Sequence, residues 1–159
     1  ATSFWSNSHT EYLSKHVKTP VLTLKCDRSK MSFDKIIFVS DFLESDQINL
    51  EILRSLADHF NSKLVLLKIV TKDQRRSDQE ILDTAQQFAE NNHLTNFEIV
   101  IHKDASVEEG IATYANQNYI DLIAIGTHQR GGFSTLFRRS VSQNIVRTLY
   151  HPIITIPIA

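Results

Sequence analysis

The sequence alternates between short apolar runs and segments of helical periodicity, and this alternation constrains the fold more than any other feature. Each run places Ile, Val and Leu at nearly consecutive positions, which is typical of parallel strands that are covered by helices on both faces. Five strands follow from these runs, at Lys35–Ser40, Lys63–Val70, Phe97–His102, Asp121–Gly126 and Pro152–Ile158. The order of the segments predicts an α/β fold, a doubly wound open five-stranded parallel sheet.

Four amphipathic stretches separate the strands. The first has an apolar stripe at helical spacing, made by Ile48, Ile52, Leu53, Leu56, Ala57 and Phe60. Each of the other three begins with a capping box, in which an N-cap serine is followed three residues later by Glu or Gln. These boxes are Ser77/Glu80, Ser106/Glu109 and Ser140/Gln143. Ligands of such sheets bind beyond the carboxyl ends of the strands, so Asp41, Val70 and the loop after Gly126 are expected at one rim.

The charge balance argues against some classes of partner. The chain has 17 Lys and Arg against 18 Asp and Glu, so it lacks the basic field that drives binding to nucleic acids or membrane surfaces. Its single cysteine, Cys26, cannot form an internal disulfide and fits a reducing compartment. The N-terminal residues resemble neither an export signal nor a membrane span. We therefore expect a cytoplasmic protein that binds neither nucleic acid nor membrane.

The beginning of the chain resembles its end. Residues 2–25 align without a gap on residues 134–157 when Pro20 is laid on Pro152, an offset of 132 residues. The alignment keeps an aromatic residue, a capping box (Ser8/Glu11), an apolar stripe, the proline and a strand in the same order. We interpret residues 1–25 as the last helix and strand of a preceding similar domain, residues 26–33 as a linker and residues 34–159 as a complete domain. The alternative is an unrelated N-terminal helix and strand.

The sequence GTHQRGGFSTLFRRS, which begins at Gly126, resembles a motif of the universal stress protein family, and so does the opening KIIFVSDF, in which Asp41 follows the first strand. The family motif is Gly-x-x-Gly, nine residues, then Gly-Ser or Gly-Thr at the last helix. The resemblance covers residues 34–159 and implies an adenine nucleotide α-hydrolase-like sheet with strand order 3-2-1-4-5. In ATP-binding members the glycines surround the phosphates, while an aspartate after the first strand and a residue of the second contact the nucleoside.

The resemblance transfers these roles to particular residues of this chain. The implied nucleotide-binding positions are Asp41, Val70, Gly126, Gln129, Arg130, Arg139, Ser140 and Val141. Gln129 and Arg139 stand where the family has its second and third glycines. Glycine leaves the backbone bare for a phosphate, whereas a residue with a Cβ costs about 1–2 kcal/mol in the left-handed conformation. Because about 1.4 kcal/mol is tenfold in affinity, we expect no tight binding of ATP and no bound cofactor.

Binding of ATP with Mg²⁺ is the alternative. Arg130, Arg138 and Arg139 lie next to the start of the last helix, where an anion is favoured, and their charge can replace the geometry that glycine supplies. The other interpretation of these arginines is a solvated helix entrance, just as Asp41 either holds a ribose or caps the next turn. No Ser/His/Asp arrangement surrounds His128 in the sequence, and no histidines have a paired metal-ligand spacing. We therefore expect no enzyme, with slow ATP hydrolysis as the alternative.

The resemblance also implies a mode of association. Family members commonly dimerise by laying their last strands side by side, and tandem members imitate that dimer within one chain. Residues Val21–Lys25 are therefore expected to pair with Ile153–Ile158, and the chain is expected to self-associate through these segments. The expected function is that of a stress-response regulatory or interaction domain with an unidentified protein partner. The alternative is an ATP- or AMP-binding domain.

Overall fold

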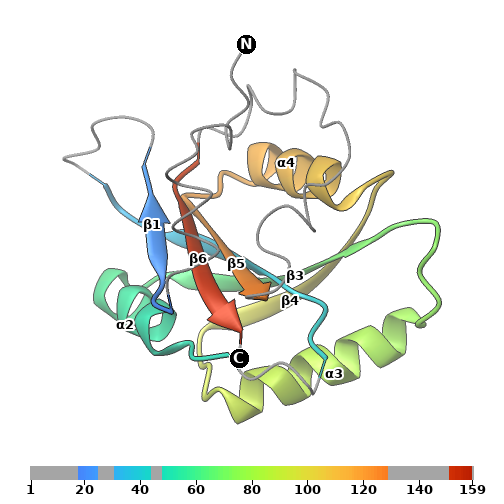
Figure 1. Cartoon of the computed structure of the whole chain (residues 1–159), viewed down its shortest axis with the longest axis horizontal. Coiled ribbons are helices and arrows are strands. Elements are labelled where there is room, and N and C mark those ends of the chain that lie inside the picture. The colour runs from blue at the N-terminus through green and yellow to red at the C-terminus, as the bar shows by residue number, and fades with distance from the viewer. Residues whose placement is uncertain (1–17, 25–30, 44–47, 129–150, 159) are drawn as a thin grey trace.

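The computed structural model describes residues 18–24, 31–43, 48–128 and 151–158 of the chain. They form a six-stranded sheet with the order β1-β6-β5-β2-β3-β4 (Figure 1). Its parallel strands are β2 (Lys35–Val39), β3 (Lys63–Val70), β4 (Phe97–Lys103), β5 (Leu122–His128) and β6 (Ile153–Ile158). The predicted α/β fold is confirmed, because the five expected strands are present in the expected order.

The sixth strand corrects the predicted strand count. Strand β1 (Val21–Thr23) joins the edge of the sheet by antiparallel pairing with β6, in a register that places Leu22 opposite Ile154. This segment was expected to pair with the last strand, but as part of a separate unit, so the prediction had five strands in the sheet. Strand β1 ends at Thr23, two residues earlier than expected.

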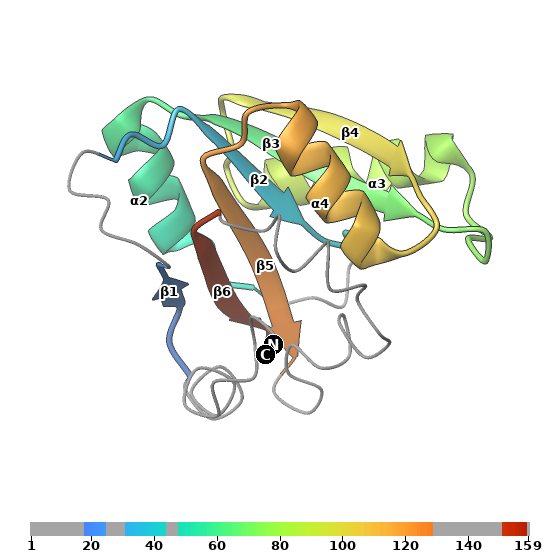
Figure 2. The same cartoon turned by 90° about the horizontal axis from the view of Figure 1, so that it is seen from above.

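Helices cover both faces of the sheet (Figure 2). The first face carries α2 (Glu51–Phe60) and α3 (Asp78–Asn91), and the second carries α4 (Val107–Gln117). Alternate residues of each strand enter opposite cores, as a pleated strand requires. In β2, Phe38 packs with residues of α2 and α3, whereas Ile37 packs with residues of α4. Helix α4 approaches β3 closely, because a Cβ on Gly110 would lie 2.6 Å from Ile69 Cγ2.

The structure confirms two of the predicted helix starts. Ser77 caps α3 and forms the full capping box with Glu80. Ser106 caps α4, and its hydroxyl accepts a hydrogen bond from the Glu109 N–H at 3.2 Å. The third predicted box, Ser140/Gln143, lies outside the described residues.

The predicted stripe of the first helix is partly wrong. Helix α2 begins only at Glu51, so Ile48 precedes it, although Ile48 still packs against the core. Within the helix Leu53 and Ala57 are buried, whereas the Ile52 side chain is 41% exposed. Ile52 does not pack in the core. It lines a groove together with Pro20, which precedes β1, and with Ile156 and Pro157 of β6.

Candidate functional site

Three of the predicted site residues lie at the carboxyl ends of neighbouring parallel strands. Strands β3, β2 and β5 are neighbours, and Val39 at the end of β2 is paired with Leu67 on one side and Ile125 on the other. The carboxyl ends of these parallel strands therefore meet, and they bring Asp41, Val70 and Gly126 to one rim. The other predicted site residues lie outside the described residues: Gln129, Arg130, Arg139, Ser140 and Val141.

A tight turn after β2 directs Asp41 outward. Phe42 has a positive φ of 54°, and its N–H donates to the Ser40 hydroxyl at 3.0 Å. The Phe42 ring is buried against Phe38 and Phe88, with a centroid separation of 5.3 Å from the Phe88 ring. A left-handed conformation costs a residue with a side chain about 1–2 kcal/mol, and burial of an aromatic ring offsets a cost of this size. As a result Phe42 points into the core while the Asp41 side chain is 62% exposed.

The carboxylate of Asp41 is paired with a buried cation. Lys68 lies in β3, two residues before its end, and its Nζ donates a hydrogen bond to Asp41 Oδ1. The Lys68 side chain is only 10% exposed. A buried ammonium is strongly unfavourable without a partner, so Asp41 is needed here to compensate Lys68. The two charges of this pair cancel each other.

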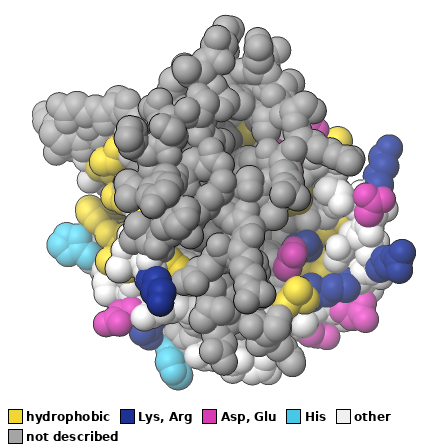
Figure 3. Space-filling view, in the orientation of Figure 1, with side chains coloured by type: hydrophobic (Ala, Val, Ile, Leu, Met, Phe, Trp, Pro, Cys, Tyr) yellow, Lys and Arg dark blue, Asp and Glu magenta, His cyan; other side chains and the backbone are white. Residues whose placement is uncertain are grey.

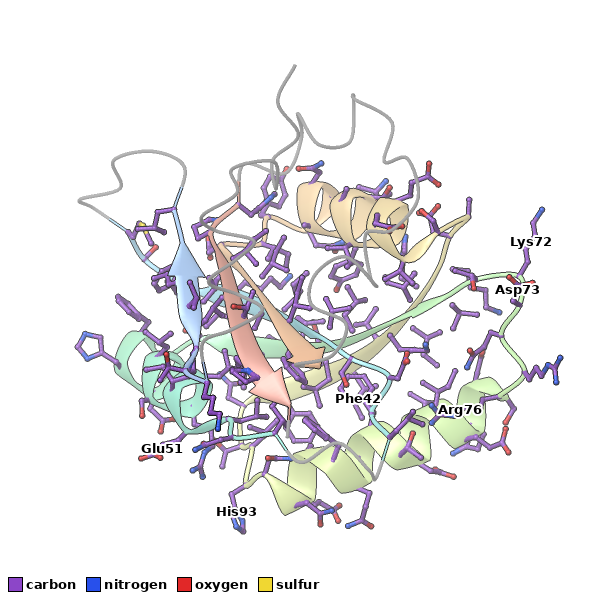
Figure 4. All side chains as sticks on the ribbon, in the orientation of Figure 1. Phe42, Glu51, Lys72, Asp73, Arg76 and His93 are labelled. Carbon is purple, nitrogen blue, oxygen red and sulfur yellow. The ribbon has the colours of Figure 1, made fainter. Side chains whose placement is uncertain are left out.

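A second cation holds the backbone of the same turn. Arg76, just before α3, donates from Nη1 to the Asp41 carbonyl at 2.9 Å and from Nη2 to Thr84 Oγ1. Figure 4 shows Arg76 beside the segment that carries Phe42, between the sheet and α3. Arg76 therefore ties the end of β2 to α3. Asp41 is thus held at its carboxylate by Lys68 and at its carbonyl by Arg76.

Sequence reasoning missed both cations. Lys68 lies within the apolar run Lys63–Val70, and the sequence analysis assigns no role to either residue. A signal for the first was present, since a lysine within a buried strand has to reach either solvent or a carboxylate. No comparable signal pointed to Arg76, because its partners come from a distant turn and a later helical position.

The described residues offer no metal centre. Within residues 18–24, 31–43, 48–128 and 151–158, no group of three or more His, Cys, Asp and Glu side chains could hold a metal ion. At the end of β4, His102 Nε2 lies 3.4 Å from Asp104 Oδ2 but lacks hydrogen-bond geometry. The His102 ring packs edge-on against Tyr114, at a centroid separation of 5.8 Å. This arrangement supports a packing role for His102.

Burial also affects one side chain next to this site. It raises the pKa of Tyr114 above its ordinary value of 10.0, and the negative charge of Glu98 acts in the same direction. Tyr114 is thus neutral in the ordinary pH range.

No helix in the described ranges is long and apolar enough to cross a membrane.

Solved structures of similar fold include universal stress proteins. A universal stress protein in complex with cAMP matches with a TM-score of 0.59 at 17% identity, over 81% of this chain and 100% of that one. A universal stress protein from Archaeoglobus fulgidus matches with a TM-score of 0.66 at 17% identity, over 94% of this chain and 54% of that one. At these identities the likeness shows the fold alone.

A third solved structure, a functionally unknown protein from Pseudomonas aeruginosa, matches with a TM-score of 0.62 at 15% identity. The match covers 96% of this chain and 57% of that one. This chain therefore spans a little over half of the Archaeoglobus and Pseudomonas proteins. No curated protein matches the sequence significantly. The model of the Universal stress protein family matches residues 32–157, most of the chain. The protein therefore belongs to the universal stress protein family.

Proposed function

We propose that this chain is a regulatory or protein-interaction domain of the stress response that does not bind ATP tightly and does not catalyse a reaction. The observation that carries the proposal is the presence of Gln129 and Arg139 where family members that bind ATP have glycines. Asp41, Val70 and Gly126 lie at the rim formed by the carboxyl ends of the strands. In the sequence, Gln129 and Arg139 replace two glycines whose bare backbone a triphosphate approaches in the family members that bind ATP.

The contacts of Asp41 support the same proposal. An aspartate kept free for a ribose would not need a protein partner, but this one compensates the buried Lys68 and is anchored by Arg76. Both contacts explain Asp41 as a residue of the folded structure without any ligand. A ribose hydroxyl would have to bind the carboxylate oxygens in addition to Lys68.

Calorimetric titration with ATP and Mg²⁺ tests this proposal. The chain should give no saturable heat in the micromolar range, whereas the double variant Gln129→Gly, Arg139→Gly should gain about tenfold in affinity per restored glycine. The control is Gln129→Ala, Arg139→Ala, which removes the same polar groups but keeps each Cβ and should gain little. Micromolar binding by the unmodified chain, lost in Ser140→Ala and Asp41→Ala, would overturn the proposal.

The second candidate is a nucleotide-binding domain. It is favoured by one comparison, the similar universal stress protein in complex with cAMP, and by the three arginines Arg130, Arg138 and Arg139. A cyclic monophosphate carries one charged phosphate and demands less bare backbone than a triphosphate does. The titration should therefore be repeated with cAMP, and saturable binding that is weakened by Arg139→Ala would select this candidate.

A further inference from the structure

A pocket of about 540 Å³ lies between the start of α2 and the end of α3. Its polar lining comes from Asn49, Glu51 and Arg54 on the α2 side and from Asn91, Asn92 and His93 on the α3 side. Figure 3 shows charged and histidine side chains gathered at the lower left of the molecule, where Figure 4 labels Glu51 and His93. A volume of this size is within the range of small-molecule sites. We call this space the Arg54 pocket.

The Arg54 pocket is separate from the rim that carries Asp41. Arg76, which holds the Asp41 carbonyl, contacts Thr84 in the first half of α3, whereas the pocket begins at Asn91, the last residue of that helix. Thr84 and Asn91 are about two helical turns apart, or about 10 Å along the axis. Figure 4 shows His93 at the end of α3 that lies away from Arg76. A ligand of this pocket is therefore not a ligand of the rim.

Arg54 is a half-buried cation without a partner among the described residues. It lies in α2 between Glu51 and Asp58, at spacings that allow ion pairs on a helix surface, yet it pairs with neither. Arg54 also lines a second pocket, of about 170 Å³, so it adjoins two open spaces. Its guanidinium has five N–H donors in a planar fork that matches two oxygens of a carboxylate or a phosphate. These donors are available to a ligand.

Two asparagines add further donors to the Arg54 pocket. Asn49 Oδ1 accepts a hydrogen bond from the Glu51 N–H at 2.9 Å. Asn91 Oδ1 accepts one from Gln87 Nε2 at 3.0 Å. The oxygen of each side-chain amide is therefore used within the protein, while its NH₂ group has no partner in the described part of the chain. Both amides thus offer N–H groups to a ligand.

Two groups of the pocket act in the opposite sense. Glu51 contributes a carboxylate, and Asn92 donates to the Phe88 carbonyl at 2.9 Å, which leaves the Asn92 oxygen as an acceptor. His93 brings an imidazole ring on a backbone of positive φ, 55°, and its N–H donates to the Glu90 carbonyl at 3.1 Å. The donors of Arg54, Asn49 and Asn91 outnumber these acceptors, so the pocket suits a ligand with a single negative group.

We infer that the Arg54 pocket binds a small molecule through an oxyanion, either a carboxylate or a phosphate. The guanidinium of Arg54 would hold two of its oxygens, as charge-assisted bidentate pairs do. The amides of Asn49 and Asn91 would donate to the same group from the two helices. Glu51 would weaken the binding of the anion by like-charge repulsion. The inference does not depend on whether the rim binds a nucleotide.

NMR titration of the ¹⁵N-labelled 159-residue chain tests the inference, with inorganic phosphate in one arm and succinate in the other. We expect saturable shifts of the amides of residues 49–54 and 91–93 in at least one arm, beyond those caused by sodium chloride at equal ionic strength. Saturation by phosphate alone would assign a phosphate-bearing ligand, and saturation by succinate alone a carboxylate. Saturation by both would assign the shared oxyanion. The absence of saturable shifts in both arms would overturn the inference.

Three variants separate this site from general attraction of anions. Arg54→Gln should weaken the binding about tenfold or more, whereas Glu51→Gln should strengthen it because a like charge is removed. The matched control is Arg75→Gln, which loses the same charge at an exposed position before α3 and should leave the affinity unchanged. Equal weakening by Arg54→Gln and Arg75→Gln would contradict the site, and so would weaker binding in Glu51→Gln.

Discussion

At the scale of single residues, the ion pair between Lys68 and Asp41 links the fold to the candidate site. The two partners are not equivalent, since Lys68 is buried and Asp41 is mostly exposed. Removing the charge of Asp41 leaves a buried ammonium without its partner, whereas removing Lys68 leaves a carboxylate that water can solvate. Replacing Asp41 and replacing Lys68 should therefore change the free energy of unfolding by different amounts.

This asymmetry predicts the stability of three variants in urea denaturation. Asp41→Asn should lower the free energy of unfolding by about 1–3 kcal/mol, because Lys68 loses its charged acceptor. Lys68→Met, which replaces a buried charge by an apolar side chain of similar length, should be close to neutral. The double variant should recover most of the loss caused by Asp41→Asn. Equal losses in the two single variants would contradict the asymmetric role.

The residues of the rim were only partly predictable from the sequence. Asp41, Val70 and Gly126 could be placed because strand ends meet in a parallel sheet, so position along the chain is enough. The roles of Lys68 and Arg76 depend on which side chains meet across the sheet and α3. Such contacts are set by three-dimensional packing, and neither hydrophobic period nor local motif encodes them.

At the scale of elements, helix starts were predictable where a side chain caps them. Ser77 and Ser106 mark the starts of α3 and α4 because their hydroxyls accept hydrogen bonds from the first turn. Helix α2 lacks such a mark, since its N-cap is Leu50 with no side-chain hydrogen bond. Its apolar periodicity continues upstream through Ile48, which made the predicted stripe too long.

The capping box of α3 predicts a dependence on pH. The Ser77 N–H and hydroxyl both donate to the Glu80 carboxylate and hold its pKa below the ordinary value of 4.5. A carboxyl group with a lowered pKa stabilises the fold above its ordinary pKa, and this contribution is lost as the pH falls through the lowered value. NMR titration of the Glu80 carboxyl carbon should show the lowered pKa, and Ser77→Ala should raise it. A pKa that is unchanged in Ser77→Ala would contradict the box.

At the scale of the whole molecule, the register of β1 agrees with the internal repeat. The offset of 132 residues makes Leu22 equivalent to Ile154, and these two residues lie opposite each other in the antiparallel pair. A local two-fold axis through this pair would relate two copies of one strand, as in an isologous contact. The register is consistent with the assignment of residues 1–25 to a preceding domain, which stays a prediction.

The central claim also concerns the whole molecule, because strands from the length of the domain build the rim. The protein places Asp41, Val70 and Gly126 at one rim, and we propose that Gln129 and Arg139, at the glycine positions of the family motif, prevent tight binding of a triphosphate. An NMR titration of the ¹⁵N-labelled chain with ATP and Mg²⁺ tests the claim most directly. We predict no saturable shift of the Asp41, Val70 and Gly126 amides at micromolar nucleotide. Saturable shifts of these three amides at that concentration would contradict the claim.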